Sequence, residues 1–367
     1  MSEPTKRPTD LRYSLLTGVG GIGAGIFFQL EGNHTLGRNE SRPARLLPVR
    51  DYCKLHIISH YVAALLAADT VTGQFQVMPI GKVGKDQPGA DMQQEMAEAG
   101  MDLRFVHSVP DLPTLMSVCF HYPDGAGGNL TTTHSAAAAL TTEDINLVEP
   151  LLRTAGRRAI ALAAPEVPLP RRQHLLQLAQ RCGAMRVLVI TSAEADQAKT
   201  MDIFALADLL AVNEDEAVAI AGRPFDDGQT DAFLAALGES LGVQSREMSI
   251  IFTAGPRGAW TFANGQWSHR PAIKAKVAST AGAGDALLGG VIAGLAGGLP
   301  LAPKSSDFTD AAERPLTGAA DLGALLASFA ITSPHTIHPD VSGQSLLQLA
   351  ASLDVTLSHQ MEQFLSR

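Results

Sequence analysis

Short apolar runs alternate with longer helical segments along most of this 367-residue chain, and this rhythm limits its fold more than any other feature. Apolar runs bounded by Gly, Pro or polar residues are typical of buried strands, and apolar residues three or four apart are typical of helices. Strands that alternate with helices favour a parallel sheet covered on both faces, so we predict an α/β protein. Strands are expected at 13–19, 75–80, 159–163, 185–190, 209–212 and 249–253, and helices at 52–68, 87–100, 286–303 and near 175, 202, 218 and 236.

A hairpin interrupts this rhythm at residues 114–122 and 129–133, around the Asp-Gly dipeptide at 124–125. We expect segments 26–50 and 112–134 to form a small β lid. No repeat or long linker divides the chain, so a single domain over residues 1–367 is expected. The Pro-, Ser- and Asp-rich stretch at 303–317 is predicted to be a surface insertion.

The charge balance argues against a polyanion as partner. The chain has 28 Lys and Arg against 37 Asp and Glu, whereas proteins that grip nucleic acid or anionic membranes usually have a basic excess. The three cysteines are far apart and form no CxxC, which disfavours a zinc site or a disulfide framework. Together with a polar N-terminus and no apolar stretch of spanning length, this indicates a cytoplasmic protein with no membrane partner.

The segment KVASTAGAGDALLGG at 276–290 carries the clearest chemistry. A small-residue turn at 282–284 is followed by Asp285 and an apolar helical run. Free backbone N–H groups at a helix start bind anions, and small residues let the anion approach. A carboxylate beside such an anion hole suits a general base for a hydroxyl that attacks a phosphoryl group. A plain helix N-terminus with Asp285 as cap explains the same spacing, and the spacing alone leaves both interpretations open.

The sequence TAGAGDALLGG resembles the signature D-T-x-G-A-G-D of the PfkB/ribokinase family of carbohydrate and nucleoside kinases. Three further segments agree with that family in order: GKVGKDQPG at 81–89 with G-x-V-G-x-D-x-x-G, VNEDEAVAIAG at 212–222 with N-x-x-E, and IFTAGPRGAW at 251–260 with T-x-G-x-x-G. The resemblance runs from about residue 13 to about 339. It implies a ribokinase-like three-layer α/β/α sandwich with a mostly parallel central sheet and a small β lid.

The resemblance also implies an activity, which is magnesium-dependent transfer of the ATP γ-phosphoryl to a hydroxyl of a sugar or sugar derivative. Asp285 would be the catalytic base, with the backbone of Gly282, Ala283 and Gly284 as the anion hole. Glu216 would serve the magnesium ion together with Asn213. The implied nucleotide-binding residues are Asn213, Glu216, Thr253, Gly255, Gly258, Thr280 and Ser328.

The substrate side diverges from the family pattern. The acid that relatives carry near the end of the first strand is replaced by Gly25, and residues 50–59 lack the family's Gly-Gly-x-x-x-Asn segment. A basic stretch with Arg38, Arg42, Arg45, Arg50 and Lys54 suggests an anionic substrate, with a solvated surface loop as the alternative. The candidate substrate-binding residues are Gly25, Arg38, Asn39, Lys54, Asn129 and Glu166.

Other departures leave alternatives open. Ser279 replaces an Asp that in some relatives helps to bind a monovalent cation, so such a cation is not expected here. A nucleoside kinase on the same fold and a catalytically inactive binding protein remain alternatives to a sugar kinase. Pairing of an exposed lid strand across a homodimer is a further hypothesis.

Overall fold

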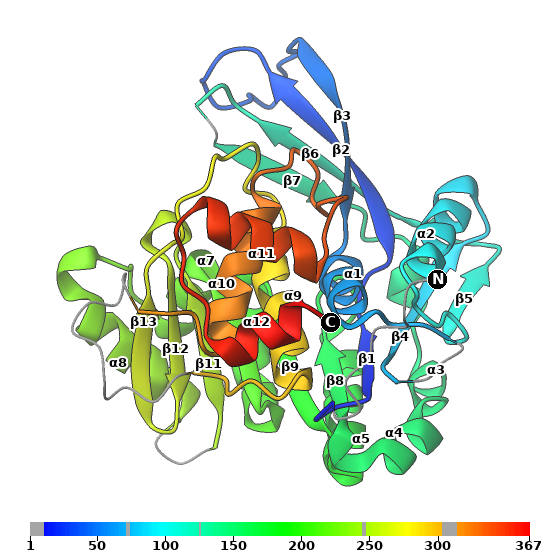
Figure 1. Cartoon of the computed structure of the whole chain (residues 1–367). Coiled ribbons are helices and arrows are strands. Elements are labelled where there is room, and N and C mark those ends of the chain that lie inside the picture. Colours follow the sequence, from blue (N-terminus) through cyan, green and yellow to red (C-terminus); the bar gives the residue numbers. More distant parts are fainter. Residues whose placement is uncertain (1–10, 71–73, 125, 244–246, 303–313) are drawn as a thin grey trace, which may run out of the picture.

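The computed structural model of the chain describes residues 11–70, 74–124, 126–243, 247–302 and 314–367 (Figure 1). Its main sheet has the strand order β13-β12-β11-β10-β9-β8-β1-β4-β5. All pairs from β11 to β5 are parallel, whereas β12 and β13 add two antiparallel strands at one edge. The strands are β1 (Leu15–Val19), β4 (Gln76–Gly84), β5 (Val106–Val109), β8 (Ala159–Ala163), β9 (Met185–Val189), β10 (Leu209–Asn213), β11 (Ser249–Thr253), β12 (Ala259–Ala263) and β13 (Gln266–Arg270).

Helices cover both faces of this sheet, and nearly every residue of its central strands is therefore buried. One face packs against α1 (Lys54–Leu66), α2 (Gln87–Glu98), α9 (Ala283–Ala296), α10 (Ala319–Ala330), α11 (Gly343–Ser352) and α12 (His359–Leu365). The other face packs against α3 (Thr142–Asn146), α4 (Glu149–Ala155), α5 (Leu169–Cys182), α6 (Ala195–Thr200), α7 (Glu214–Ala221) and α8 (Thr230–Leu241).

A second, four-stranded sheet projects from one end of the main sheet (Figure 1). Its strand order is β3-β2-β6-β7, with β2 and β6 parallel and the outer pairs antiparallel. Its strands are β2 (Gly23–Leu30), β3 (Ala44–Tyr52), β6 (Leu115–His121) and β7 (Gly127–Thr131). We call this element the small sheet; it is formed by the two chain segments that the sequence assigned to a lid.

The predicted α/β sandwich with a mostly parallel sheet and a small accessory sheet is confirmed. Boundaries differ where the two sheets join. The helix expected at 52–68 begins at Lys54, because residues up to Tyr52 pair with β2 as part of β3. Strands β5, β12 and β13 were not predicted. Residues 303–313 of the predicted insertion and Gly125 of the hairpin lie outside the described residues.

Within the described part of the chain, no helix combines the length and the apolar character needed to cross a membrane. The three cysteines, Cys53, Cys119 and Cys182, are free thiols.

Candidate active site

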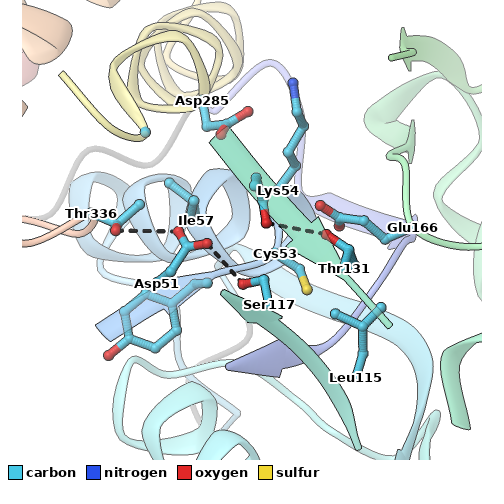
Figure 2. A pocket seen from close by; sticks show the side chains of 13 residues that line it. Asp51, Cys53, Lys54, Ile57, Leu115, Ser117, Thr131, Glu166, Asp285 and Thr336 are labelled. Atoms are coloured by element: carbon cyan, nitrogen blue, oxygen red, sulfur yellow. Dashed lines mark hydrogen bonds between the residues drawn. The ribbon is translucent and has the colours of Figure 1, made fainter. Parts of the chain in front are cut away.

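Two cavities meet at the carboxyl ends of the central strands, which is where ligands bind in open α/β sheets. The larger cavity has a volume of about 790 Å³ and lies over β10, β11 and the N-terminus of α9. The smaller cavity has a volume of about 140 Å³ and lies between α9 and the small sheet (Figure 2). Lys54, Gly282 and Asp285 line both cavities. A group in one cavity can therefore approach a group in the other at these three residues.

The N-terminus of α9 forms the wall between the cavities. Gly282 caps the helix at φ 76°, and a Cβ there would lie 2.7 Å from Thr336 Cγ2, so glycine is required. Helix α9 begins at Ala283, three residues before the predicted helix start at Ala286. The Ala283 N–H donates to the Thr280 carbonyl, whereas the N–H groups of Gly284 and Asp285 lie in the first turn, where no intrahelical acceptor is within reach.

Asp285 is the third residue of α9, and the N-terminus of this helix has no capping box among the described residues. The cap is Gly282, so the interpretation of Asp285 as a helix cap is not supported. Burial raises the pKa of Asp285 to about 6, against the lowering effect of Lys54; Glu216 and Asp51 raise it further. Among the described residues this carboxylate has no hydrogen-bond partner, and it lines both cavities with a pKa in the range that suits a general base.

Lys54 is the cation at this junction. Its Nζ donates to Glu216 Oε1 at 3.2 Å. The negative charges of Asp285, Glu216 and Glu166 raise the pKa of Lys54 above its ordinary value despite burial, so the ammonium stays charged at neutral pH. Glu216 Oε2 accepts from the Asn213 N–H at 2.8 Å, and Asn213 Oδ1 accepts from the Glu216 N–H, which closes a capping box on α7.

The larger cavity brings together all the residues that the sequence assigned to the nucleotide. Gly255 (φ 52°) and Gly258 (φ 92°) turn the chain between β11 and β12, and a Cβ on Gly258 would lie 2.1 Å from the Arg270 carbonyl oxygen. The Ser328 hydroxyl lies within hydrogen-bond distance of the backbone carbonyls of Ile273 and Ala324, so it ties this wall to α10. The predicted residues in the lining are Asn213, Glu216, Thr253, Gly255, Gly258, Thr280, Gly282, Ala283, Gly284, Asp285 and Ser328.

The smaller cavity contains three of the predicted substrate residues, Lys54, Asn129 and Glu166. Glu166 follows β8 in a left-handed backbone conformation (φ 70°), and its buried Oε2 has no hydrogen-bond partner within the described part of the chain. Burial raises the pKa of Glu166 to about 7, with Lys54 opposing the shift and Asp285 adding to it. Sequence reasoning missed four polar residues of this lining, which are Asp51, Ser117, Thr131 and Thr336.

The other predicted substrate residues lie elsewhere. Gly25 sits beneath the cavity in β2, and Arg38 and Asn39 are exposed in the connection between β2 and β3. Among the remaining cations, Arg42 pairs with Glu40. Arg38, Arg42, Arg45 and Arg50 line neither of the two cavities, so only Lys54 of the basic stretch reaches the site.

The motif at 81–89 supports the small sheet rather than lining either cavity. Asp86 caps α2 by accepting from the Gly89 N–H, and it also accepts from the Thr114 N–H just before β6. A Cβ on Gly84 would lie 2.5 Å from the Thr114 nitrogen, and one on Gly89 would lie 2.4 Å from the Gly84 carbonyl oxygen. The two glycines therefore let the chain between β4 and α2 pack directly against the entry to β6.

Comparisons with known proteins give the class of this fold. The structure is similar to ribokinase from Giardia lamblia, with a TM-score of 0.71, 17% identity and coverage of 96% of this chain and 99% of that one. It is also similar to Arabidopsis thaliana ribokinase complexed with ribose and ATP (TM-score 0.63, 18% identity, coverage 92% and 98%). A Burkholderia thailandensis nucleoside kinase in complex with inosine matches comparably (TM-score 0.65, 17% identity, coverage 93% and 99%). The fold is thus ribokinase-like.

The family follows from the sequence. Residues 62–342 match the model of the pfkB family carbohydrate kinases, so the chain belongs to that family. Members of this family are phosphotransferases that act on hydroxyl groups. An uncharacterized sugar kinase of Escherichia coli, YegV, is 39% identical over 103 residues, which span 27% of this chain and only 30% of that protein. A deoxyribokinase of Salmonella typhi is 25% identical over 214 residues, or 58% of this chain and 67% of that protein.

Proposed function

We propose that this chain transfers the γ-phosphoryl group of ATP to a hydroxyl of a small sugar or sugar derivative, with Asp285 as the general base. The observation that carries the proposal is the junction of the two cavities at Lys54, Gly282 and Asp285. ATP would occupy the larger cavity and the acceptor the smaller one. The similarity to a ribokinase whose structure is complexed with ribose and ATP, and the family membership, support this proposal by analogy.

The chemistry follows from the groups at the junction. Asp285 would take the proton from the attacking hydroxyl, which makes the oxygen a stronger nucleophile. The free N–H groups in the first turn of α9 and the Lys54 ammonium would stabilise the negative charge on the transferring phosphoryl. Closure of the small sheet over the acceptor would exclude water, the competing nucleophile, and in this sense we propose that it is a lid.

The side chains of Glu216 and Asn213 could hold a magnesium ion only together with ligands from the nucleotide and from water. Among the described residues no group of three or more His, Cys, Asp or Glu side chains is arranged to hold a metal. Magnesium usually takes one or two carboxylates, substrate phosphates and several waters, so it needs no protein cage. Glu216, with Asn213, would hold the ion on the nucleotide side, where the ion supplies positive charge to the phosphates.

The size of the smaller cavity favours a sugar over a nucleoside as acceptor. Its volume of about 140 Å³ lies below the roughly 300–1,000 Å³ typical of pockets for larger ligands. The similarity to a nucleoside kinase is the reason to include nucleosides in the test.

A homodimer is supported by the apolar face of the small sheet that points away from the cavity, where Leu46, Met116 and Leu130 are exposed. Sedimentation of the wild type and of Leu130→Lys measures that association.

The experiment that tests the activity is ADP release from magnesium-ATP with a panel of neutral sugars, sugar phosphates, sugar acids and nucleosides. We expect turnover with at least one sugar, with one phosphorylated acceptor formed for each ADP. ATP binding without turnover on any acceptor would favour an inactive binding protein on this fold. A preference for nucleosides over every sugar would support the alternative of a nucleoside kinase.

A further inference from the structure

The smaller cavity holds a carboxylate that the transfer step does not use. Asp51 lines the cavity from β3, while Asp285 lines it from α9 (Figure 2). Asp51 Oδ2 accepts a hydrogen bond from Ser117 Oγ at 3.0 Å and another from Cys119 Sγ at 3.2 Å. Ser117 and Cys119 are both buried, so their donors hold the carboxylate in one orientation.

Gly25 makes this arrangement sterically possible. In the register of the small sheet, Gly25 on β2 lies directly between Asp51 on β3 and Ser117 on β6. A Cβ at position 25 would lie 2.1 Å from Ser117 Oγ and 2.7 Å from Asp51 Cβ. Real side chains do not approach so closely, so Asp51 meets Ser117 across the strand because position 25 is glycine.

One oxygen of Asp51 is left for a ligand. The Thr336 hydroxyl has one proton, and it lies 3.1 Å from the Arg50 carbonyl oxygen but 3.5 Å from Asp51 Oδ1. The shorter contact takes the proton, so among the described residues no donor closer than this 3.5 Å contact reaches Oδ1. No ion pair of Asp51 with Lys or Arg is found among the described residues. An ionised carboxylate only accepts hydrogen bonds, so the bound molecule must supply donors.

The charges around the cavity oppose an anionic acceptor. The described residues of its lining include three carboxyl groups, those of Asp51, Glu166 and Asp285, and one ammonium group, that of Lys54. Arg50, the neighbour of Asp51 in the sequence, turns away from the cavity and pairs with Asp91 and Glu95 of α2. The basic stretch predicted to recognise an anion therefore does not offset these carboxylates.

We propose that Asp51 binds hydroxyl groups of an uncharged, polyhydroxylated acceptor and that the cavity rejects sugar phosphates and sugar acids. This inference rests on the proposed function and narrows it, because it assigns acceptor selection to a residue of β3. Asp51 positions and selects the acceptor, whereas Asp285 acts on the reacting hydroxyl.

The test compares the wild type with Asp51→Asn, which keeps the shape and removes the charge, and with Asp91→Asn, which removes a carboxylate outside the cavity. We expect the wild type to use neutral sugars far more efficiently than their phosphate or acid counterparts. Asp51→Asn should raise the acceptor KM about 10- to 100-fold, because hydrogen bonds to charged groups are the stronger ones. The KM for ATP should stay unchanged, and Asp91→Asn should behave as the wild type.

Deoxy analogues of the best neutral sugar sharpen the result. For the analogue that lacks the hydroxyl bound by Asp51, the Asp51→Asn substitution should no longer change the acceptor KM. An unchanged acceptor KM in Asp51→Asn for the full sugar would overturn the proposal, and so would a sugar phosphate or sugar acid used as efficiently as the neutral sugar.

Calorimetric binding of the neutral sugars, in the presence of a non-hydrolysable ATP analogue, separates this inference from the proposed function. If no acceptor is turned over, sugar binding that weakens in Asp51→Asn still supports the role of Asp51. Absence of neutral sugar binding, or equal binding by the two proteins, contradicts it.

Discussion

The larger cavity is lined mostly by small and apolar residues, whereas the smaller cavity is lined by polar side chains from several separate strands, such as Asp51, Ser117 and Thr131. In the larger cavity, Gly255, Gly258 and Gly284 keep the backbone accessible. In the smaller cavity, Asp51 and Glu166 contribute carboxyl side chains to the lining. A cosubstrate shared by many enzymes can be bound through backbone geometry, but an acceptor is selected by side chains. Substitutions on the two sides should therefore fail in different ways.

The largest effect outside Asp285 is expected at Lys54, the cation that belongs to both cavities. Lys54→Met should lower kcat about 10²- to 10³-fold, because a charged donor aimed at the transferring group would be lost. Lys274 lines only the larger cavity, so Lys274→Met should mainly raise the KM for ATP. Steady-state kinetics with both substrates varied measures this difference. Equal kcat losses in the two variants would remove the distinction between the junction and the larger cavity.

Two glycines at the start of α9 give a matched pair for stability. Gly282→Ala should lower the free energy of unfolding by about 1–3 kcal/mol, because φ is 76° and the new Cβ meets Thr336. The new Cβ in Gly284→Ala meets no described atom within 4 Å outside its own helix and its chain neighbours, so this substitution should gain up to about 1 kcal/mol of helix propensity. Its methyl group would project into the larger cavity and raise the KM for ATP.

Denaturant titration and nucleotide kinetics of both glycine variants check this prediction. If the two substitutions lowered the free energy of unfolding equally, the prediction would be wrong, because only the Cβ at position 282 is expected to meet a neighbouring residue.

The pH dependence of turnover should report the state of Asp285. Its pKa is raised to about 6, so the carboxylate is ionised above that pH and protonated below it. The base is lost as pH falls, and kcat/KM should decrease about tenfold per pH unit below pH 6. Because Lys54 lowers the pKa of Asp285, Lys54→Met should move this acid limb to higher pH. Residual activity that follows a limb near pH 4 would contradict the raised pKa.

The sequence predicted the larger cavity better than the smaller one, for a physical reason. Asn213 and Glu216 form a local capping box, and Gly255 and Gly258 are needed by one short turn, so each pattern carries its own structure. These segments meet because parallel strands end at the same edge of the sheet. The alternation of strands and helices was therefore enough to predict that the residues of these segments lie close together.

The smaller cavity depends on pairing that no local pattern reveals. Asp51 enters it because β3 pairs with β2, and Thr336 enters it from the segment after α10. The predicted lid segment ends at residue 50 and the predicted helix begins at residue 52, which hides the alternation of side chains along β3 up to Tyr52. The replacement at Gly25 was a visible signal, but only the register shows that it makes room for Asp51. A shift of one residue would turn Asp51 to the other face of the sheet.

The most direct test of this account is turnover of the best neutral sugar by Asp285→Asn, with nucleotide binding measured on the same protein. The account predicts a loss of kcat of at least about 10²-fold, with the Kd for the nucleotide within a few-fold of the wild type. The control variant is Asp91→Asn, which should keep full activity. Near-normal turnover by Asp285→Asn would contradict the central claim, which is that a phosphoryl group passes from ATP in the larger cavity to an acceptor in the smaller one with Asp285 as the base.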